Sequence, residues 1–479
     1  MLTLEAILNN NTSIFETCTS PNKVIYDRIH PLFYFLYSET YWIFLMNIYA
    51  YICFLAALSI LLGFITSKIS ARVQSTVAIT AAAMFCSLLV WILGSFGWFK
   101  IDVIAKNVME QIDFKSFLLN GILGFLLFAG SLGVKLPVLK DQKWEITAFA
   151  LISTLISTFL IALLIWMPAN LIGLPIDFIY CVVFGALISP TDPIAVLAII
   201  KNLRAPKRLS MQVEGESLFN DGVGLVIFVT VFTVAFSGQE TSVGNIFSLF
   251  MHEAIGGILF GFLLGFIAHV LISSTDDGSM EILITLTIPS AGFMFASNVL
   301  HVSGALAMVV AGIMIGNWTR RSGFSEQSQR YLDHFWEMID HFLNSLLFFL
   351  IGFALLLVDF EFYGIVLMII AIPVCLISRY LSLWIPFKGM QQFRTYNPYT
   401  LKIMTWGGLR GGLALAMALS IPSKTAFAGS IDVKDLILVM TYAVVMFSIL
   451  VQGSTIEPMI RKSKTVDPNR EEYLQPSKH

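Results

Sequence analysis

Long apolar runs alternate with short polar stretches along the chain. A helix that crosses a bilayer needs about 20 apolar residues, and thirteen runs approach or reach that length. We expect these segments at 42–66, 75–99, 116–134, 145–167, 177–200, 215–237, 250–272, 281–299, 302–316, 340–358, 363–386, 400–420 and 435–454. The pattern predicts an all-α polytopic membrane protein with about thirteen transmembrane helices.

Composition agrees with this pattern and excludes several classes of protein. Of the 479 residues, 57% are hydrophobic and 13% are charged, whereas a soluble domain has about 25% charged residues. A net charge of −2 lacks the basic excess of a nucleic-acid-binding protein, so the expected surroundings are a lipid bilayer. The 5 cysteines are scattered, without the spacing of a metal site or disulfide framework.

Basic residues predict the orientation, because cytoplasmic loops retain Lys and Arg. With the N-terminus outside, 20 basic residues fall on the inner side and 7 on the outer side. Residues 1–41 are then extracytoplasmic, 42–460 form the transmembrane domain and 461–479 form a short cytoplasmic tail. We expect a plasma membrane location, the inner membrane if the chain is bacterial.

Five charged residues remain deep inside the apolar segments. Arg379 and Arg410 are basic, and Asp192, Glu216 and Asp221 are acidic. Charges at membrane depth are costly and are usually paired or functional. Their sum is one negative charge, which suits a site for one monovalent cation or one proton. The alternative is that burial simply keeps one carboxylate protonated.

The stretch ISPTDPIAV, residues 188–196, interrupts the fifth segment with two prolines. Each proline lacks a backbone donor and disfavours helix at the preceding residue. We expect an unwound gap at Thr191 and Asp192, with Asp192 at the positive N-terminus of the next half-helix. Such gaps in transporters coordinate small cations, although a simple kink capped by Asp192 would give the same pattern.

The stretch GESLFNDG, residues 215–222, gives the sixth segment a polar stripe. Helical spacing places Glu216 with Asn220, and Ser217 with Asp221, on neighbouring faces. We expect the amide of Asn220 to orient Asp221 without adding a second titrating charge. A helix end at the membrane interface is the alternative.

The stretch GGLRGG, residues 407–412, interrupts the twelfth segment around Arg410. Glycines weaken a helix and allow close backbone approach, which could also mean only a tightly packed helix pair. The guanidinium of Arg410 favours a break, because it can face the negative C-terminal end of another broken helix. Segments five and twelve run in opposite directions, as in transporters built from inverted repeats with two discontinuous helices.

Arg379, in LISRYLSLW of the eleventh segment, needs a buried partner. Glu216 is the deep carboxylate that an ion site at Asp221 and Asp192 leaves available. We predict a structural ion pair between Glu216 and Arg379, and the alternative is that Arg379 extends to the cytoplasmic edge.

Together these residues resemble bacterial sodium/proton antiporters of the NhaP kind, which are relatives of eukaryotic sodium/proton exchangers. The resemblance rests on SPTDPIAV, GESLFNDG, VVAGIMIGN (309–317), FLNSLLFFLIG (342–352) and GGLRGG, and it covers segments three to thirteen. It implies two crossed discontinuous helices in a transport core, about 145–237 and 363–454. A dimerisation part would cover about 42–134 and 281–358, with 250–272 linking the two.

The resemblance also implies a function and a site. The chain is expected to be a homodimeric secondary transporter that exchanges Na⁺, or else Li⁺ or K⁺, for H⁺ in pH and sodium homeostasis, without a cofactor. Asp221 would carry the cation or proton, with Asp192, Thr191 and Ser217 nearby. Asn220, Glu216, Arg379 and Arg410 would support it, and an Asn–Asp pair implies electroneutral exchange by alternating access. One departure is Ala129, in LLFAGSL (126–132), where some relatives have a carboxylate.

Three other classes compete with a transporter. An intramembrane aspartyl protease needs two facing aspartates, and Asp192 and Asp221 qualify superficially, but neither follows a GxGD-type motif. A passive cation channel would conduct without moving protons in exchange. A membrane scaffold would not need Asp221.

Overall fold

The computed structural model describes residues 48–69, 75–95, 116–203, 205, 207–236, 242–358, 362–394, 396–429 and 431–465. The chain divides into two compact units, Met1–Ala57 and Leu58–His479. Of the first unit only residues 48–57 are described, and they belong to helix α3 (Ile48–Ile69). The fold below is that of the second unit, and the predicted segment 1–41 lies outside the described residues.

Helices form almost all of the second unit, because backbone polar groups inside lipid must be satisfied within their own segment. Its first half contains α4 (Ser75–Ser95), α6 (Leu123–Leu132), α7 (Leu136–Asp141), α8 (Lys143–Thr147), α9 (Ser153–Leu171), α10 (Phe178–Ile188), α11 (Ile194–Asn202), α12 (Lys207–Phe236) and α13 (Val243–Ile272). π-Helical turns η1 (Ser116–Ile122) and η2 (Ala148–Ile152) lead into α6 and α9.

The second half has the same character. It contains α14 (Gly278–Thr287), η3 (Ile288–Gly292), α15 (Phe293–Asn298), α16 (Gly304–Met314), η4 (Ile315–Thr319), α17 (Arg320–Ser322), α18 (Glu326–Phe353), η5 (Ala354–Leu357), α19 (Phe362–Met390), α20 (Thr400–Trp406), α21 (Gly412–Leu419), α22 (Val433–Phe447), η6 (Ser448–Gln452), α23 (Gly453–Thr455) and α24 (Glu457–Thr465). Strands β1 (Phe427–Ala428) and β2 (Ile431–Asp432) pair antiparallel before α22. The first residues of the predicted tail, 461–465, continue α24.

Seven helices in the described part of the chain are long and apolar enough to cross a membrane. They are Lys143–Leu171, Arg208–Phe236, Gly244–Ile272, Gly278–Asn298, Ser328–Leu357, Phe362–Met390 and Val433–Thr455. The fifth and twelfth predicted segments do not reach this length, because each is interrupted near its middle. The interruptions separate α10 from α11 and α20 from α21.

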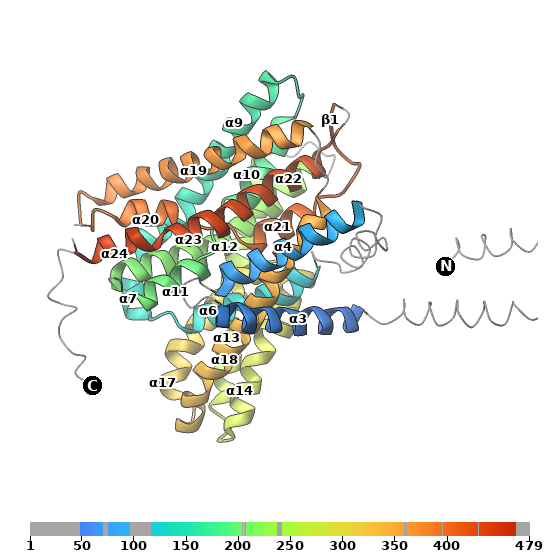
Figure 1. Cartoon of the computed structure of the whole chain (residues 1–479). Coiled ribbons are helices and arrows are strands. Elements are labelled where there is room, and N and C mark those ends of the chain that lie inside the picture. Colours follow the sequence, from blue (N-terminus) through green and yellow to red (C-terminus); the bar gives the residue numbers. More distant parts are fainter. Residues whose placement is uncertain are drawn as a thin grey trace, which may run out of the picture. The chain divides into compact units, whose positions relative to one another are not determined.

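Two apolar clusters lie on either side of α12. The first is built mainly by α6, α13, α15, α16 and α18, and α12 contributes Met211 and Leu218 to it. The second is built by α11, α19, α20 and α24, and α12 contributes Leu209 and Val213. In Figure 1, α9, α10, α19 and α22 lie together, and they pack against one another, while α13 packs on α16 and α16 on α6. α12 therefore positions its polar stripe between two separately packed groups of helices.

Candidate functional site

The two helix breaks lie side by side. Pro190 and Pro193 flank the first break, and α10 ends at Ile188 while α11 begins at Ile194. The backbone N–H of Asp192 donates to the carbonyl oxygen of Leu409 at 2.8 Å, and the two residues form an isolated antiparallel bridge. The unwound gap predicted at Thr191 and Asp192 is confirmed, and its partner is the gap around Leu409.

The carboxylate of Asp192 caps α11 and also lies against the second break. Its Oδ1 accepts the N–H of Ile194 at 2.9 Å, which caps the start of α11. Its Oδ2 lies so close to Gly411 that a Cβ at position 411 would overlap it. Glycine at 411 is therefore what permits the backbone of the second break to approach the carboxylate of the first.

Arg410 faces the negative end of a broken helix, as the sequence predicted. Its Nη1 donates to the carbonyl oxygens of Ser189 and Pro190, the second at 2.8 Å. These carbonyls follow the last turn of α10, where the helix has no intrahelical donor for them. The backbone N–H of Arg410 donates to Ser448 Oγ at 2.9 Å, so η6 holds the arginine in place.

The predicted ion pair between Glu216 and Arg379 is present. Nη1 and Nη2 of Arg379 donate to Oε1 and Oε2 of Glu216, each at 2.7 Å. The side chains are 4% exposed for Arg379 and 2% for Glu216. Nη2 also donates to the carbonyl of Met404 at 3.2 Å. The pair therefore ties α12 to α19 and to the end of α20, and Arg379 does not extend to the membrane edge.

Asn220 has different partners from those expected. Its Nδ2 donates to Glu216 Oε1 at 2.7 Å and to Thr191 Oγ1 at 2.8 Å, and its Oδ1 accepts the N–H of Thr191 at 3.2 Å. The prediction that its amide orients Asp221 is wrong, because adjacent residues on a helix point about 100° apart. Thr191 Oγ1 also lies 3.3 Å from Ser217 Oγ. Asn220 thus connects the ion pair to the first break.

Asp221 differs from the other deep charges. It is half-buried, and within the part of the chain that the structure describes its carboxylate forms no hydrogen bond or ion pair. It lies within electrostatic range of Asp192, Glu216 and Arg410. Glu216 is already paired and Arg410 faces carbonyl groups. Asp221 is therefore the deep carboxylate that needs a proton or a cation to offset its charge.

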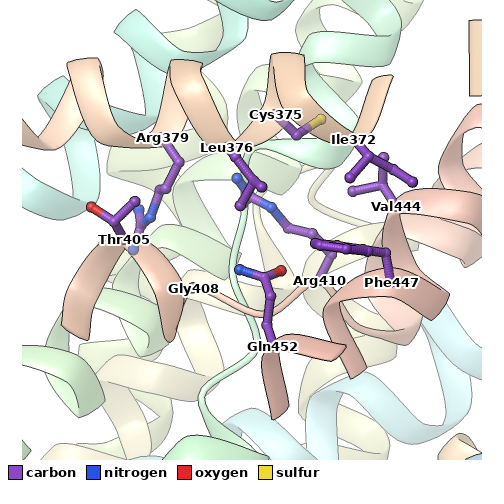
Figure 2. A pocket seen from close by; sticks show the side chains of 10 residues that line it. All are labelled: Ile372, Cys375, Leu376, Arg379, Thr405, Gly408, Arg410, Val444, Phe447 and Gln452. Carbon is purple, nitrogen blue, oxygen red and sulfur yellow. The ribbon is translucent and has the colours of Figure 1, made fainter. Parts of the chain in front are cut away.

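Arg379 and Arg410 line a small cavity between α19, the second break and the end of α22 (Figure 2). Its volume is about 10 Å³, which is room for about one water molecule. Arg379 Nε borders it without a hydrogen-bond partner among the described residues, and a Cβ at Gly408 would lie 2.7 Å from this nitrogen. Gln452 also lines the cavity, and its Nε2 donates to the carbonyl of Trp406 at 2.9 Å.

Sequence reasoning missed Ser448 and Gln452. Both support the second break, through Arg410 and Trp406. Their signal was available, since each is a polar residue within the apolar segment 435–454. The described residues contain no group of three or more His, Cys, Asp or Glu placed to hold a metal ion.

Ala129 lies on α6 and packs against the first apolar cluster. The neighbouring Gly130 is 3.7 Å, measured to an ideal Cβ, from Cδ1 of Leu218 on α12. The helix that carries Ala129 therefore packs against the helix that carries Asp221. The methyl group here adds no charge to the site.

Comparisons with known proteins show the family to which the chain belongs. The family described as sodium/hydrogen exchanger, transmembrane, matches residues 91–462. The Na⁺/H⁺ antiporter NhaP of Pseudomonas aeruginosa is 41% identical over 410 residues, which cover 85% of this chain and 95% of that protein. The Na⁺/H⁺ antiporter NhaH of Halobacillus dabanensis is 32% identical over 368 residues, covering 76% of this chain and 87% of that protein.

A solved structure matches the fold as well. It is that of the sodium proton antiporter MjNhaP1 from Methanocaldococcus jannaschii, with a TM-score of 0.69 and 18% sequence identity. The match covers 87% of this chain and 99% of that one.

Proposed function

Because the chain belongs to the sodium/hydrogen exchanger family, we propose that it is a multi-pass membrane transporter that exchanges Na⁺ for H⁺. It is a transporter rather than an enzyme, and Na⁺ and H⁺ are its cargo. The observation that supports this most directly is Asp221, a half-buried carboxylate without a partner among the described residues, next to the buried ion pair of Glu216 and Arg379.

Asp221 carries either the cation or the proton. A carboxylate that is removed from water favours its neutral or neutralised form, so the two cargoes compete for the same oxygens. Oxygens of Thr191, Ser217 and Asp192 belong to the same network or lie within range, and they complete the surroundings of the ion. Li⁺ or K⁺ would use the same oxygens, and Ala129 leaves the site without a further carboxylate from α6.

Exchange is electroneutral, with one cation for one proton. Glu216 and Arg379 neutralise each other, and the single positive charge of Arg410 leaves Asp192 and Asp221 with a net charge of −1. Asp221 then has one negative charge, which either cargo neutralises. The site with a bound cation and the protonated site have equal net charge, so one exchange cycle moves no net charge across the membrane.

The proposed architecture has thirteen spans, with α10–α11 and α20–α21 as two crossed discontinuous helices of inverted repeats. The antiparallel bridge between Asp192 and Leu409 supports the crossing, and the two apolar clusters support a core moving against a dimerisation part. The protein works as a homodimer by alternating access, in the plasma membrane with the N-terminus outside. Its role is pH and sodium homeostasis.

The test is transport in proteoliposomes that contain a pH-sensitive dye. Asp221→Asn abolishes Na⁺-driven proton flux, because the amide holds neither a proton nor a cation in exchange. The matched control is Glu253→Gln on α13, a carboxylate within an apolar span that takes no part in the network. Substantial Na⁺-driven proton flux in Asp221→Asn would overturn the assignment, and cation uptake without proton movement in the unmodified protein would indicate a channel.

A further inference from the structure

Helix α18 passes directly beside the second break. A Cβ at Gly412 would overlap the side chain of Leu347 on α18. Gly412 follows Gly411, which contacts the carboxylate of Asp192. The side of α18 that carries Leu347 therefore faces the paired breaks.

Two polar residues precede Leu347 on this side of α18. Asn344 is one turn earlier and Asp340 is two turns earlier, at the spacing that places residues on one helix face. Asn344 is 3% exposed, and it lies close enough to Asp340 to affect the charge of that carboxylate. The Oδ1 of Asn344 is buried and has no hydrogen-bond partner in the described part of the chain. An orphaned buried acceptor next to a carboxylate is an unusual arrangement, since such groups are normally satisfied.

Asp340 interacts electrostatically with residues at both ends of α11, one of which belongs to the proposed ion site. Asp340 is half-buried and lies within electrostatic range of Lys201, at the C-terminal end of α11. The charge of Asp340 also reaches Asp192, at the other end of α11. Asp340 is therefore within electrostatic range of both ends of α11.

We propose that Asp340 and the Oδ1 of Asn344 form an access site, where a monovalent cation is held on its way to Asp192 and Asp221. The proposal rests on the exchange function above. Two oxygens, one of them charged, suit a hard cation such as Na⁺. Lys201 limits occupancy by repulsion, so the ion is held weakly enough to move on.

The expected effect is on the apparent affinity for Na⁺ and not on the maximal rate. Asp340→Asn keeps the size of the side chain and removes its charge. A site that concentrates ions before the reaction contributes to binding equally in all later states, so its loss raises KM and leaves kcat unchanged. Loss of one charged ligand of a bound ion weakens binding by up to about tenfold, or about 1.4 kcal/mol, and we expect KM to rise about 3- to 10-fold. Lys201→Gln lowers KM, because it removes the opposing charge.

The experiment measures Na⁺-driven proton flux against Na⁺ concentration in proteoliposomes, at constant protein content. The matched control is Asp333→Asn, a carboxylate two turns earlier on α18 with 65% of its side chain exposed. We expect Asp340→Asn to raise KM, Lys201→Gln to lower it and Asp333→Asn to leave it unchanged. A KM for Asp340→Asn equal to that of the control, or a fall in kcat alone, would overturn the access site.

A second measurement separates a local site from a general surface field. Exposed charges are screened by salt, whereas partly buried ones are screened much less. The KM difference between Asp340→Asn and the unmodified protein should persist when choline chloride raises the ionic strength. If it disappears, Asp340 acts only through the surface field and the access site is rejected. Absence of exchange in the unmodified protein would refute the proposed function instead.

Discussion

The ion pair between Glu216 and Arg379 allows the sharpest test of what holds the site together. Both side chains are almost fully buried and are joined by two hydrogen bonds of 2.7 Å. Replacing either residue by glutamine leaves the other charge buried without compensation. Loss of one partner from such a pair costs about 3–5 kcal/mol, so each single variant should be strongly destabilised.

The double variant Glu216→Gln/Arg379→Gln should recover part of this loss. Neither buried charge remains, and two amides can still hydrogen-bond each other and Asn220, which donates to Glu216 Oε1 at 2.7 Å. Residues in one buried network show interaction energies of about 0.5–3 kcal/mol. Because the pair is bidentate and almost fully buried, we expect a coupling near the upper end of that range, about 2 kcal/mol or more.

The assay is equilibrium unfolding in mixed detergent and SDS micelles, followed by tryptophan fluorescence. Arg461→Gln serves as the control, because Arg461 pairs with Glu457 on α24 at a site where 64% of the arginine side chain is exposed. Exposed pairs contribute about 0–1 kcal/mol, so this variant should unfold nearly like the unmodified protein. A coupling below about 0.5 kcal/mol between Glu216 and Arg379 would refute the reasoning, whatever the transport activity.

Two further predictions follow from the same contacts. If exchange is electroneutral, the Na⁺ gradient that balances a fixed pH gradient in liposomes should not change when potassium and valinomycin impose a membrane potential. A potential of 100 mV is worth about 2.3 kcal/mol for each net charge moved, so any net charge movement would shift that balance. A shift with voltage would implicate Asp192 as a second proton carrier. Gly411→Ala should sharply reduce transport, because the added Cβ overlaps Asp192 Oδ2. The control Gly389→Ala on α19 should remain active, because no atom lies within 4 Å of its added Cβ. Normal transport by Gly411→Ala would show that the close approach at Asp192 is dispensable.

Several features of the site could be predicted from sequence, because their causes are local or concern charge balance. Prolines 190 and 193 disrupt a helix through their own sterics, and the break appears where they lie. Arg379 lies inside an apolar span, and the sequence has only three carboxylates at similar depth. Glu216 could therefore be chosen as its partner by elimination. The helical spacing of Glu216 and Asn220 predicted a shared face, and their side chains bond to each other.

Other features depended on which segments meet in space. The sequence indicated that Asn220 is polar and buried but not that Thr191, 29 positions away, would take its amide away from Asp221. Nothing local in α18 shows that the charge of Asp340 reaches both Lys201 and Asp192, because charged side chains usually face water.

The sequence by itself determined the class of protein, the position of both helix breaks and the presence of one uncompensated negative charge at membrane depth. These follow from apolar length, from backbone sterics and from the high cost of burying charge, which act on each segment separately. Only the tertiary structure decided that Asp192 bonds across to Leu409 and that Arg410 faces the end of α10. It also decided that, among the described residues, Asp221 is the deep carboxylate without a hydrogen bond or ion pair. These polar groups form hydrogen bonds with helices that are distant in sequence, and which groups become partners is decided only when the helices pack together.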